Sequence, residues 1–537
     1  MTNPFPGSSD AGSPDAVSFF SPTPLLCEES APGRRGAILP SPDTKVKVPA
    51  PPPELLRENL DLPELDEGTV VRHFTALSHK NFSVDGRFYP LGSCTMKYNP
   101  RMNEAAAAER GFCLSHPLSG DGAAQGNLEL MYRLQKALEE ITGFTASSLQ
   151  CAAGAQGELA GLLMIRARHR KAGETDRVRV LIPDSAHGTN PATASMAGFT
   201  AETIPSDSSG GIDMAALREA LGGERGRTLA GMMITNPNTL GLFEKNIEEI
   251  IRLVHEAGGL VYGDGANMNA LLGIVKPGEL GFDVMHLNLH KTFSTPHGGG
   301  GPGAGAVLAG KALADFLPGP VAVRVKPQAE DGGPGPANGP GPASGLGPAS
   351  GLGPASGPAY RLARPPLSIG RLKIFNGNFS ILVRAWAYIR TLGGTGLRRA
   401  SEYAVLNANY LRHLVRADYP TPYGADRPCM HEFTAAPELA NGLHTIDAAK
   451  RLIDYGFHPP TVYFPLIVKE ALMAEPTETE RKETLDAFAA ALTAIAGEAR
   501  DNPGLLREAP HGSPVGRLDE TAAARNPVLR WPAFEKG

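Results

Sequence analysis

The chain has 537 residues, more than one hydrophobic core usually serves, so we expect two or more domains. Hydrophobic residues make up 42% and charged residues 20% of the sequence, as is ordinary for a soluble globular protein. The net charge is −5 with both signs interspersed, so neither nucleic acid nor an anionic membrane is favoured as a partner, and no apolar run approaches the roughly 20 residues that span a bilayer.

The N-terminus and the cysteines bear on cellular location. No basic region followed by an apolar stretch opens the chain, so we see no secretory signal, and residues 1–22 carry Asp10 and Asp15 but no arginine, which argues against a mitochondrial transit peptide. The cysteines are odd in number and lack C-x-x-C spacing: Cys27, Cys94, Cys113, Cys151 and Cys429. We therefore expect free thiols in a reduced cytoplasm and no cysteine-bound metal.

The N-terminal region is rich in proline. Residues 1–60 predict an extended arm that wraps a neighbouring chain, although an unstructured tail fits the first twenty or so residues equally well. Residues 89–100 are bracketed by prolines and too irregular for a helix or a strand. Polar groups able to contact a ligand are dense there: Tyr89, Ser93, Thr95, Lys97 and Tyr98. On its residues alone this segment is a loop.

A helix is predicted over residues 127–142, because apolar side chains recur on one face and Gly143 stands where the helix would end. Farther on, Gly154, Ala155 and Gln156 precede an apolar segment. Small residues at the mouth of a helix expose its first N–H groups, which favours binding of a phosphate. Taken alone, this signal is weak.

The chain then alternates between strands and helices. Strands are predicted over residues 178–182, 229–234, 260–263 and 284–289, with a helix over 243–257 that ends near Gly258. Strand, helix and strand at such short spacings predict a mostly parallel sheet with helices on both faces. In such sheets the ligand lies beyond the carboxyl ends of the strands.

Four polar residues come just after these predicted strands, and we expect them to converge on one edge of the sheet: His187, Asn236, Asp264 and Lys291. A lysine held at the rim of a cleft can form an imine with a carbonyl compound. The glycine-rich run at 298–303 would let backbone amides crowd around an anion.

Pyridoxal phosphate requires this set of groups. Lys291 would form an aldimine with its aldehyde, Asp264 would keep its ring nitrogen protonated, and His187 would stack on its ring. The phosphate would be bound by Gly154, Ala155 and Gln156, with His290 and Thr292 as further donors, and the predicted cofactor-binding set also includes Asn236 and Asn267. Each residue alone has a structural explanation: a cap for Asp264, an ordinary loop histidine for His187, and turn chemistry for Asn236. Their coincidence favours the cofactor.

The rest of the chain predicts three further regions, after a large cofactor domain at 61–327. Residues 328–358 repeat Gly-Pro-Ala-Ser-Gly-Leu and cannot form a core, so we expect a flexible surface insertion. Residues 359–500 predict a helix over 405–415 and a smaller α+β domain, with a strand near 462–468 and a helix near 483–496. Residues 501–537 predict a peripheral tail.

Long and unusual strings between about residues 34 and 480 carry a resemblance to a known family: 81–85, 89–101, 154–158, 186–191, 264–267, 290–293 and 475–480. In them the chain resembles the pyridoxal-phosphate-dependent P-proteins of the glycine cleavage system, in the form divided between two chains. Within that pair it is similar to the chain that carries the cofactor lysine. Two features depart from the family pattern, the repeat insertion and the extended first twenty-odd residues, and neither touches a motif.

The resemblance implies a fold of type I, the aspartate-aminotransferase type, with a lysine aldimine at Lys291. It places the 89–100 loop near the active site. It also implies two partners: a related subunit 1 that lacks the cofactor lysine, paired into a heterotetramer of two plus two chains, and the lipoylated H-protein. The metal-free reaction it implies is decarboxylation of glycine with transfer of the aminomethyl group to the oxidised lipoyl arm.

Two rival functions stay open on sequence alone. One is another fold-type-I enzyme, an aminotransferase or an amino-acid decarboxylase of different specificity. The other is a catalytically silent scaffold subunit, which the presence of both Lys291 and Asp264 disfavours. The residue that binds the glycine carboxylate is not evident, and Arg371 is a guess.

Overall fold

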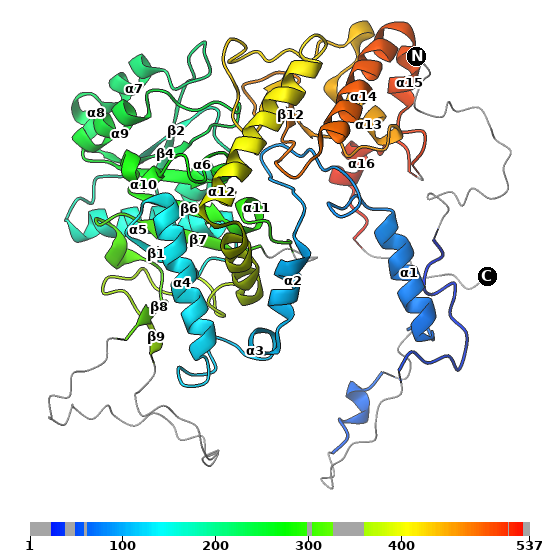
Figure 1. Ribbon diagram of the computed structural model, residues 1–537, viewed down its shortest axis with the longest axis horizontal. Coiled ribbons are helices and arrows are strands. Elements are labelled where there is room, and N and C mark those ends of the chain that lie inside the picture. Colours follow the sequence, from blue (N-terminus) through cyan, green and yellow to red (C-terminus); the bar gives the residue numbers. More distant parts are fainter. Residues whose placement is uncertain are drawn as a thin grey trace.

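The computed structural model describes residues 23–37, 49–57, 62–297, 303–325, 359–513 and 515–529. Three expectations fall outside these residues: the flexible insertion at 328–358, most of the glycine-rich run after Lys291, and the tail formed by the first twenty or so residues. Figure 1 shows the described chain as a large α/β body joined to a smaller C-terminal part.

Within the described residues, the main sheet has seven strands in the order β1-β7-β6-β5-β4-β2-β3. The strands are β1 (Ala146–Ser148), β2 (Arg179–Pro183), β3 (Thr200–Ile204), β4 (Leu229–Thr235), β5 (Leu260–Gly265), β6 (Val284–Asn288) and β7 (Gly305–Ala309). Neighbours from β3 to β6 pair in parallel, whereas β7 runs antiparallel to both β6 and β1. The mostly parallel sheet predicted from the sequence is confirmed.

Helices cover both faces of this sheet. Along β4, Met232 and Ile234 belong to a core that includes α4 (Gln125–Thr142) and α9 (Ile247–Glu256). Met233 belongs to a second core on the opposite face, with α5 (Gly154–Lys171). Successive side chains of a strand point to opposite faces, so one strand serves both cores.

Two predicted helices on these faces have different outcomes. The predicted helix at 127–142 is confirmed, and Gly143 ends it with a left-handed φ of 77°. The helix predicted over 243–257 begins later, at Ile247, because Glu244 instead accepts the backbone N–H of Ile212 and Asn246 through its carboxylate in the preceding turn. Gly258 follows that helix with a φ of 79°, as expected from its place in the sequence.

Lys291 does not lie on a strand. Strand β6 ends at Asn288, and the chain continues into the single helical turn α11 (Leu289–Thr292), closed by a hydrogen bond from Phe293 N–H to Leu289 O. The expectation that the strand continues to Leu289 is therefore wrong by one residue. Lys291 still stands beyond the carboxyl end of the strand, at the edge where a parallel sheet binds its ligand.

A long helix, α12 (Phe379–Val415), joins the large body to the C-terminal part and is bent at Gly393, where φ is 59°. Only residues 405–415 were expected to be helical, so that prediction is too short by about seven turns. Figure 1 shows α12 in yellow, running past α4 toward α14 (Lys482–Asp501).

The C-terminal part packs α13 (Thr445–Asp454) and α14 over a small antiparallel sheet with the described order β10-β12-β11. Its strands are β10 (Phe433–Ala435), β11 (Thr461–Val462) and β12 (Leu472–Ala474). The strand expected at 462–468 is wrong beyond Val462, because Tyr463 has a left-handed φ of 57° and the chain turns there. Nor are all the last forty residues peripheral: Leu506 on α15 (Pro503–Glu508) is fully buried in this core.

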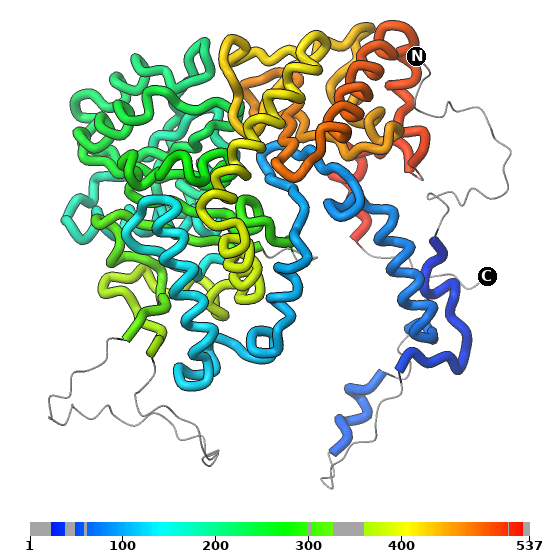
Figure 2. Tube along the Cα trace, in the orientation of Figure 1, coloured from blue at the N-terminus to red at the C-terminus, as the bar shows by residue number. Residues whose placement is uncertain are grey.

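The remaining elements complete the described chain. They are η1 (Pro53–Leu55), α1 (Glu67–His79), α2 (Arg101–Ala108), α3 (Arg110–Cys113), α6 (Thr189–Met196), α7 (Met214–Leu221), α8 (Gly223–Arg227), η2 (Met268–Ala270), α10 (Pro277–Leu280), η3 (Ala314–Phe316), β8 (Val321–Arg324), β9 (Tyr360–Ala363), η4 (Ala440–Gly442) and α16 (Glu520–Arg525). Helix α1 extends away from the body in Figures 1 and 2, and none of its residues is buried. Among the described helices, none has the length and apolar character required to cross a membrane.

Candidate active site

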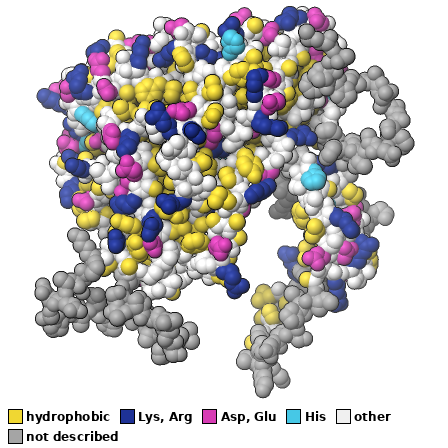
Figure 3. Space-filling model, in the orientation of Figure 1, with side chains coloured by type: hydrophobic (Ala, Val, Ile, Leu, Met, Phe, Trp, Pro, Cys, Tyr) yellow, Lys and Arg dark blue, Asp and Glu magenta, His cyan; other side chains and the backbone are white. Residues whose placement is uncertain are grey.

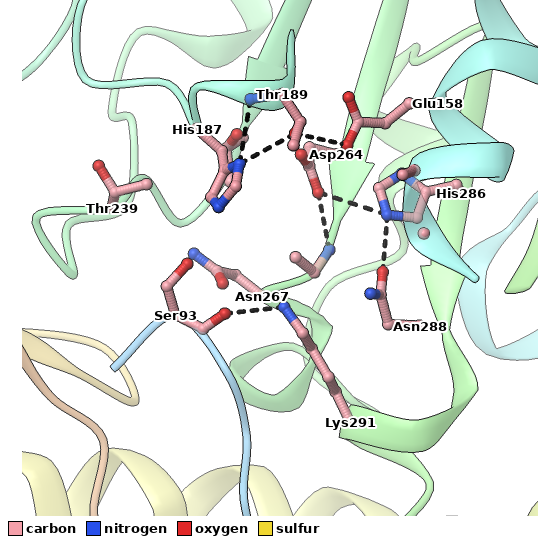
Figure 4. A pocket seen from close by; sticks show the side chains of 14 residues that line it. Ser93, Glu158, His187, Thr189, Thr239, Asp264, Asn267, His286, Asn288 and Lys291 are labelled. Carbon is pink, nitrogen blue, oxygen red and sulfur yellow. Dashed lines mark hydrogen bonds and ion pairs between the residues drawn. The ribbon is translucent and has the colours of Figure 1, made fainter. Parts of the chain in front are cut away.

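A cavity of about 540 Å³, counted with its open mouth, lies at the carboxyl edge of the main sheet. It is lined by Ser93, Gly154, Ala155, Glu158, His187, Thr189, Thr235, Thr239, Asp264, Ala266, Asn267, His286, Asn288 and Lys291. Figure 4 shows these side chains. Lys291 and Asp264, which the sequence predicts to share one ligand, therefore face the same cavity.

Lys291 enters the cavity from α11. Its Nζ donates a hydrogen bond of 2.7 Å to the backbone carbonyl of Ser93, as Figure 4 shows. Ser93 has a φ of 63°, a left-handed conformation that non-glycine residues seldom adopt. The 89–100 loop, which is only a loop by its residues, thus lies against the lysine.

Asp264 is buried at the end of β5, in contact with donors on two sides. One carboxylate oxygen accepts the Ala266 N–H at 3.0 Å and lies 3.6 Å from His286 Nε2, and the other accepts from the Asn190 amide at 3.3 Å. Burial by itself would raise the pKa of this carboxyl group, but His286, the Ala266 N–H and Lys291 outweigh it, so the pKa lies below its usual value. Asp264 is therefore held as an anion.

His286 is fixed beneath Asp264 by two further contacts. Its Nδ1 lies 2.5 Å from the Tyr262 hydroxyl, and its Nε2 lies 2.7 Å from Asn288 Oδ1. A Cβ at Gly157 of α5 would stand 2.7 Å from the Cβ of His286, so glycine is required for the helix to approach the strand this closely. These contacts hold α5, His286 and Asp264 in fixed positions relative to one another.

His187 stands in the cavity wall with its ring exposed. Its Nδ1 lies 2.9 Å from Thr189 Oγ1, and that hydroxyl donates to Glu158 at 2.8 Å. The chain of contacts from Glu158 fixes the plane of the imidazole, and the Phe464 ring lies 5.3 Å from it at a tilted angle. Figure 4 shows His187 across the cavity from Lys291.

The mouth of α5 opens into the cavity through Gly154 and Ala155. A Cβ at Gly154 would meet the Asn288 side chain at 2.6 Å, so a side chain there would close the approach. Gln156 does not line the cavity: its side chain accepts from Ala152 N–H at 2.7 Å and donates to Leu372 O at 3.1 Å. Gln156 could therefore contribute to anion binding only through its backbone N–H.

Several predicted residues lie outside the cavity lining, although Asn267 is within it. Asn236 Oδ1 accepts the Glu244 N–H at 3.0 Å, which is turn chemistry. His290, within α11, is buried with Nδ1 3.2 Å from Ala304 O, and burial lowers its pKa to about 4. The Thr292 side chain is buried, and Arg371 is exposed on the surface with its guanidinium donating to Ile374 O.

Sequence reasoning missed several lining residues. His286 and Asn288 lie two residues apart on β6, the spacing that puts both on one face of a strand, and this signal was available. Glu158 and Thr189 lie in sequence strings that carry the family resemblance, but neither residue had a predicted role at the site. An anionic carboxylate, an amine, exposed helix N–H groups and an exposed imidazole fit a phosphorylated aromatic aldehyde.

Lys97 is a second buried lysine beside the site and supports α11 from behind. Its Nζ donates to Glu478 Oε1 at 2.7 Å, Thr292 O at 2.8 Å and Asn269 Oδ1 at 2.9 Å. Burial opposes its charge, but Glu478 dominates the other contributions and the pKa of Lys97 is raised. The ion pair thus persists throughout the neutral range and ties the N-terminal loop to α11.

Replacing Lys97 with methionine is expected to destabilise the fold by about 3–5 kcal/mol, because the Glu478 carboxylate would stay buried without its cation. Denaturant unfolding measures this change. The double variant Lys97→Met/Glu478→Gln should recover much of the loss. Lys276→Met, which breaks an exposed pair with Glu140, should change stability little, because solvent screens exposed ion pairs. Equal losses for Lys97→Met and Lys276→Met would contradict the buried-pair explanation.

Comparisons with known proteins show the family of the chain. Residues 51–330 match the family model for the glycine cleavage system P-protein, and residues 400–508 match that for the glycine dehydrogenase C-terminal domain. The chain is 54% identical to the probable glycine dehydrogenase (decarboxylating) subunit 2 of Caldanaerobacter subterraneus, over 94% of this chain and 98% of the relative. It is 52% identical to the protein of the same name from Desulforamulus reducens, over 94% and 99%.

Solved structures bear on the fold. The chain resembles a glycine decarboxylase (P-protein) of the glycine cleavage system with a TM-score of 0.65 at 22% identity, covering 83% of this chain and 93% of that one. It resembles the glutamate decarboxylase of Lactobacillus brevis with a TM-score of 0.60 at 12% identity, covering 83% and 95%. The type I fold expected from the sequence is confirmed.

Proposed function

This chain belongs to the glycine cleavage system P-protein family, whose members decarboxylate glycine, and from that premise we propose that Lys291 is its catalytic lysine and the point of covalent attachment of pyridoxal phosphate. The observation that carries the proposal is the convergence of Lys291 and Asp264 on one cavity. When bound there, the cofactor supplies an electron-accepting ring for the pair of electrons released with carbon dioxide.

The chain's own residues hold and orient the groups. The Asp264 carboxylate would accept the ring N–H, and its low pKa favours the charged form that this requires. The exposed imidazole of His187 would cover the ring, and the first N–H groups of α5, at Gly154 to Gln156, would bind the phosphate. Lys291, released from its covalent link, would accept or return a proton at Nζ.

The accepting group would be the oxidised lipoyl arm of the H-protein. In the balanced reaction, glycine loses carbon dioxide, its remaining aminomethyl carbon forms a C–S bond with one sulfur, and the S–S bond breaks to leave the second sulfur as a thiol. The disulfide, carried on a long arm, would have to reach the mouth of the cavity that Lys291 lines. The five cysteines are unpaired in the structure, which supports assigning the chain to a reducing cytoplasm.

A test should measure exchange of labelled bicarbonate with the glycine carboxyl group, together with the visible absorbance of protein mixed with pyridoxal phosphate. We expect exchange that depends on lipoylated H-protein and that reaches its full rate when subunit 1 is also present. Transamination with an oxo acid in place of exchange would favour an aminotransferase. A protein that stays colourless with the cofactor would favour a silent scaffold.

Helix α1, which follows the N-terminal arm, is the surface that we assign to subunit 1, in a heterotetramer of two plus two chains. Helix α1 leaves Val71, Phe74 and Leu77 exposed on one face, with Val71 and Phe74 each 57% exposed. Figure 3 shows hydrophobic side chains exposed along this arm. An exposed apolar stripe at helical spacing indicates a partner surface.

Phe74→Asp is expected to weaken association with subunit 1 by at least about tenfold, since a charge would have to be buried in an apolar contact. Sedimentation of the mixed subunits measures the change. Arg72→Asp is the matched control, because Arg72 lies on the opposite side of α1. The assignment is wrong if both variants assemble like the natural chain.

A further inference from the structure

Two glutamates from the C-terminal part reach under the active-site loop. Glu432 precedes β10 and Glu475 follows β12, and these strands pair antiparallel with Phe433 opposite Ala474. That register puts the two glutamates side by side at one end of the small sheet. Both are almost completely buried, as is His431 beside them.

Each glutamate holds the loop that contacts Lys291. Glu432 accepts the Ser93 N–H at 2.6 Å and the Asn267 amide at 3.3 Å, and both of these residues line the cavity. Glu475 accepts the Thr95 hydroxyl at 2.5 Å. Ser93 is therefore held on its N–H side by Glu432 and presents its carbonyl on the other side to Lys291 Nζ.

The charges of this cluster do not balance if both carboxyl groups are ionised. The cluster is tight: one side-chain atom from each of the three residues His431, Glu432 and Glu475 lies within 4.8 Å of the other two. Burial raises the pKa of Glu432 to about 7 and that of Glu475 well above its usual value, and it lowers the pKa of His431 to about 3. The histidine is thus neutral and cannot compensate two anions.

Contacts within the cluster distinguish the two carboxyl groups. Glu432 has two N–H donors, the pattern of an anionic acceptor. Glu475 has one hydroxyl donor, and its second oxygen has no partner among the described residues. The charged or titratable groups that face the cluster are Lys291 on α11 and Lys97 and Cys94 on the loop.

We propose that Glu432 and Glu475 are positioning residues for Lys291. Glu475 holds a proton and Glu432 carries the negative charge. Together they fix the position of the Ser93 carbonyl and the electrostatic field at the Lys291 nitrogen. This inference rests on the proposed function and deepens it. The negative charge behind Ser93 favours the protonated form of the Lys291 nitrogen, and the pinned loop keeps that nitrogen aimed into the cavity.

The test compares variants by two readouts. The first is the pH at which the visible absorbance of protein loaded with pyridoxal phosphate changes, since that change reports protonation at the Lys291 nitrogen. The second is glycine–bicarbonate exchange, separated into kcat and KM. Glu432→Gln should move the absorbance transition to lower pH by about one unit, because a nearby opposite charge is lost. It should lower kcat about tenfold or more with a smaller effect on KM.

Glutamine is the isostere of a protonated glutamate, so Glu475→Ala should lower kcat and Glu475→Gln should restore most of it. Glu438→Gln, on an exposed loop of the same part, is the matched control and should leave both readouts as they are. The inference is overturned if Glu432→Gln matches Glu438→Gln, if Glu475→Gln is as impaired as Glu475→Ala, or if elemental analysis finds a stoichiometric metal ion that balances the charge. Failure of the natural chain to bind pyridoxal phosphate would instead overturn the proposed function.

Discussion

Lys291→Ala is expected to lower glycine–bicarbonate exchange by about 1,000-fold or more, because the variant lacks both the amine that attaches the cofactor and the group that moves protons at the reacting carbon. The fold should persist. Among the described residues the amine donates one hydrogen bond, to Ser93 O, and it stands in a cavity instead of a packed core. Exchange kinetics and thermal unfolding, measured on the same preparation, check the two halves of this expectation.

Two controls separate covalent chemistry from charge. Lys291→Arg keeps a cation near Asp264 but cannot form the covalent link, so it should be as inactive as the alanine variant. Lys311→Ala removes an exposed lysine near β7 and should leave exchange at the natural rate. Wild-type exchange by Lys291→Ala would show that the catalytic amine lies elsewhere. Loss of the cooperative thermal unfolding transition would instead mean that the variant is inactive because it misfolds.

The sheet edge was predictable because strand ends carry their own signals. Asp264 and Lys291 each follow a short apolar run, and parallel strands bring such positions together without any knowledge of side-chain contacts. Gly154 and Ala155 were found by the same logic at a helix mouth. These residues all line the cavity.

The predictions failed where a contact spans hundreds of positions. Glu432 lies 339 residues from Ser93, and Thr95 lies 380 residues from Glu475, so no local pattern connects either pair. Glutamates in an α+β segment are usually solvated, and nothing in the local sequence near Glu432 shows that it is buried. Such pairs need the packed structure.

Asn236 illustrates the opposite error. It follows a strand, like the other three polar residues, but the turn after β4 uses its side-chain oxygen to accept the Glu244 N–H. Asparagine commonly closes turns in this way, so position after a strand does not distinguish a ligand contact from a local cap. The structural explanation that the sequence left open accounts for the observed contact.

Asp264→Asn is expected to lower exchange by about 100-fold and to weaken retention of pyridoxal phosphate, because a neutral amide cannot stabilise positive charge on the ring nitrogen. Asparagine keeps the size of the side chain and one acceptor for the Ala266 N–H, so the cavity should persist. Exchange kinetics and dialysis of the loaded protein measure the two effects. Asp176→Asn, an exposed surface change, is the control and should alter neither.

The same substitution has a signed effect on stability. The folded-state pKa of Asp264 lies below the ordinary value of 3.8, so its charge contributes stability that is fully present above that pH and is lost as the pH falls through the folded-state pKa. Asp264→Asn should therefore cost most stability near neutral pH, and its difference from the natural chain should shrink in acid. A difference that grows in acid would mean that Asp264 is buried as the neutral acid, and such a group could not hold a protonated ring.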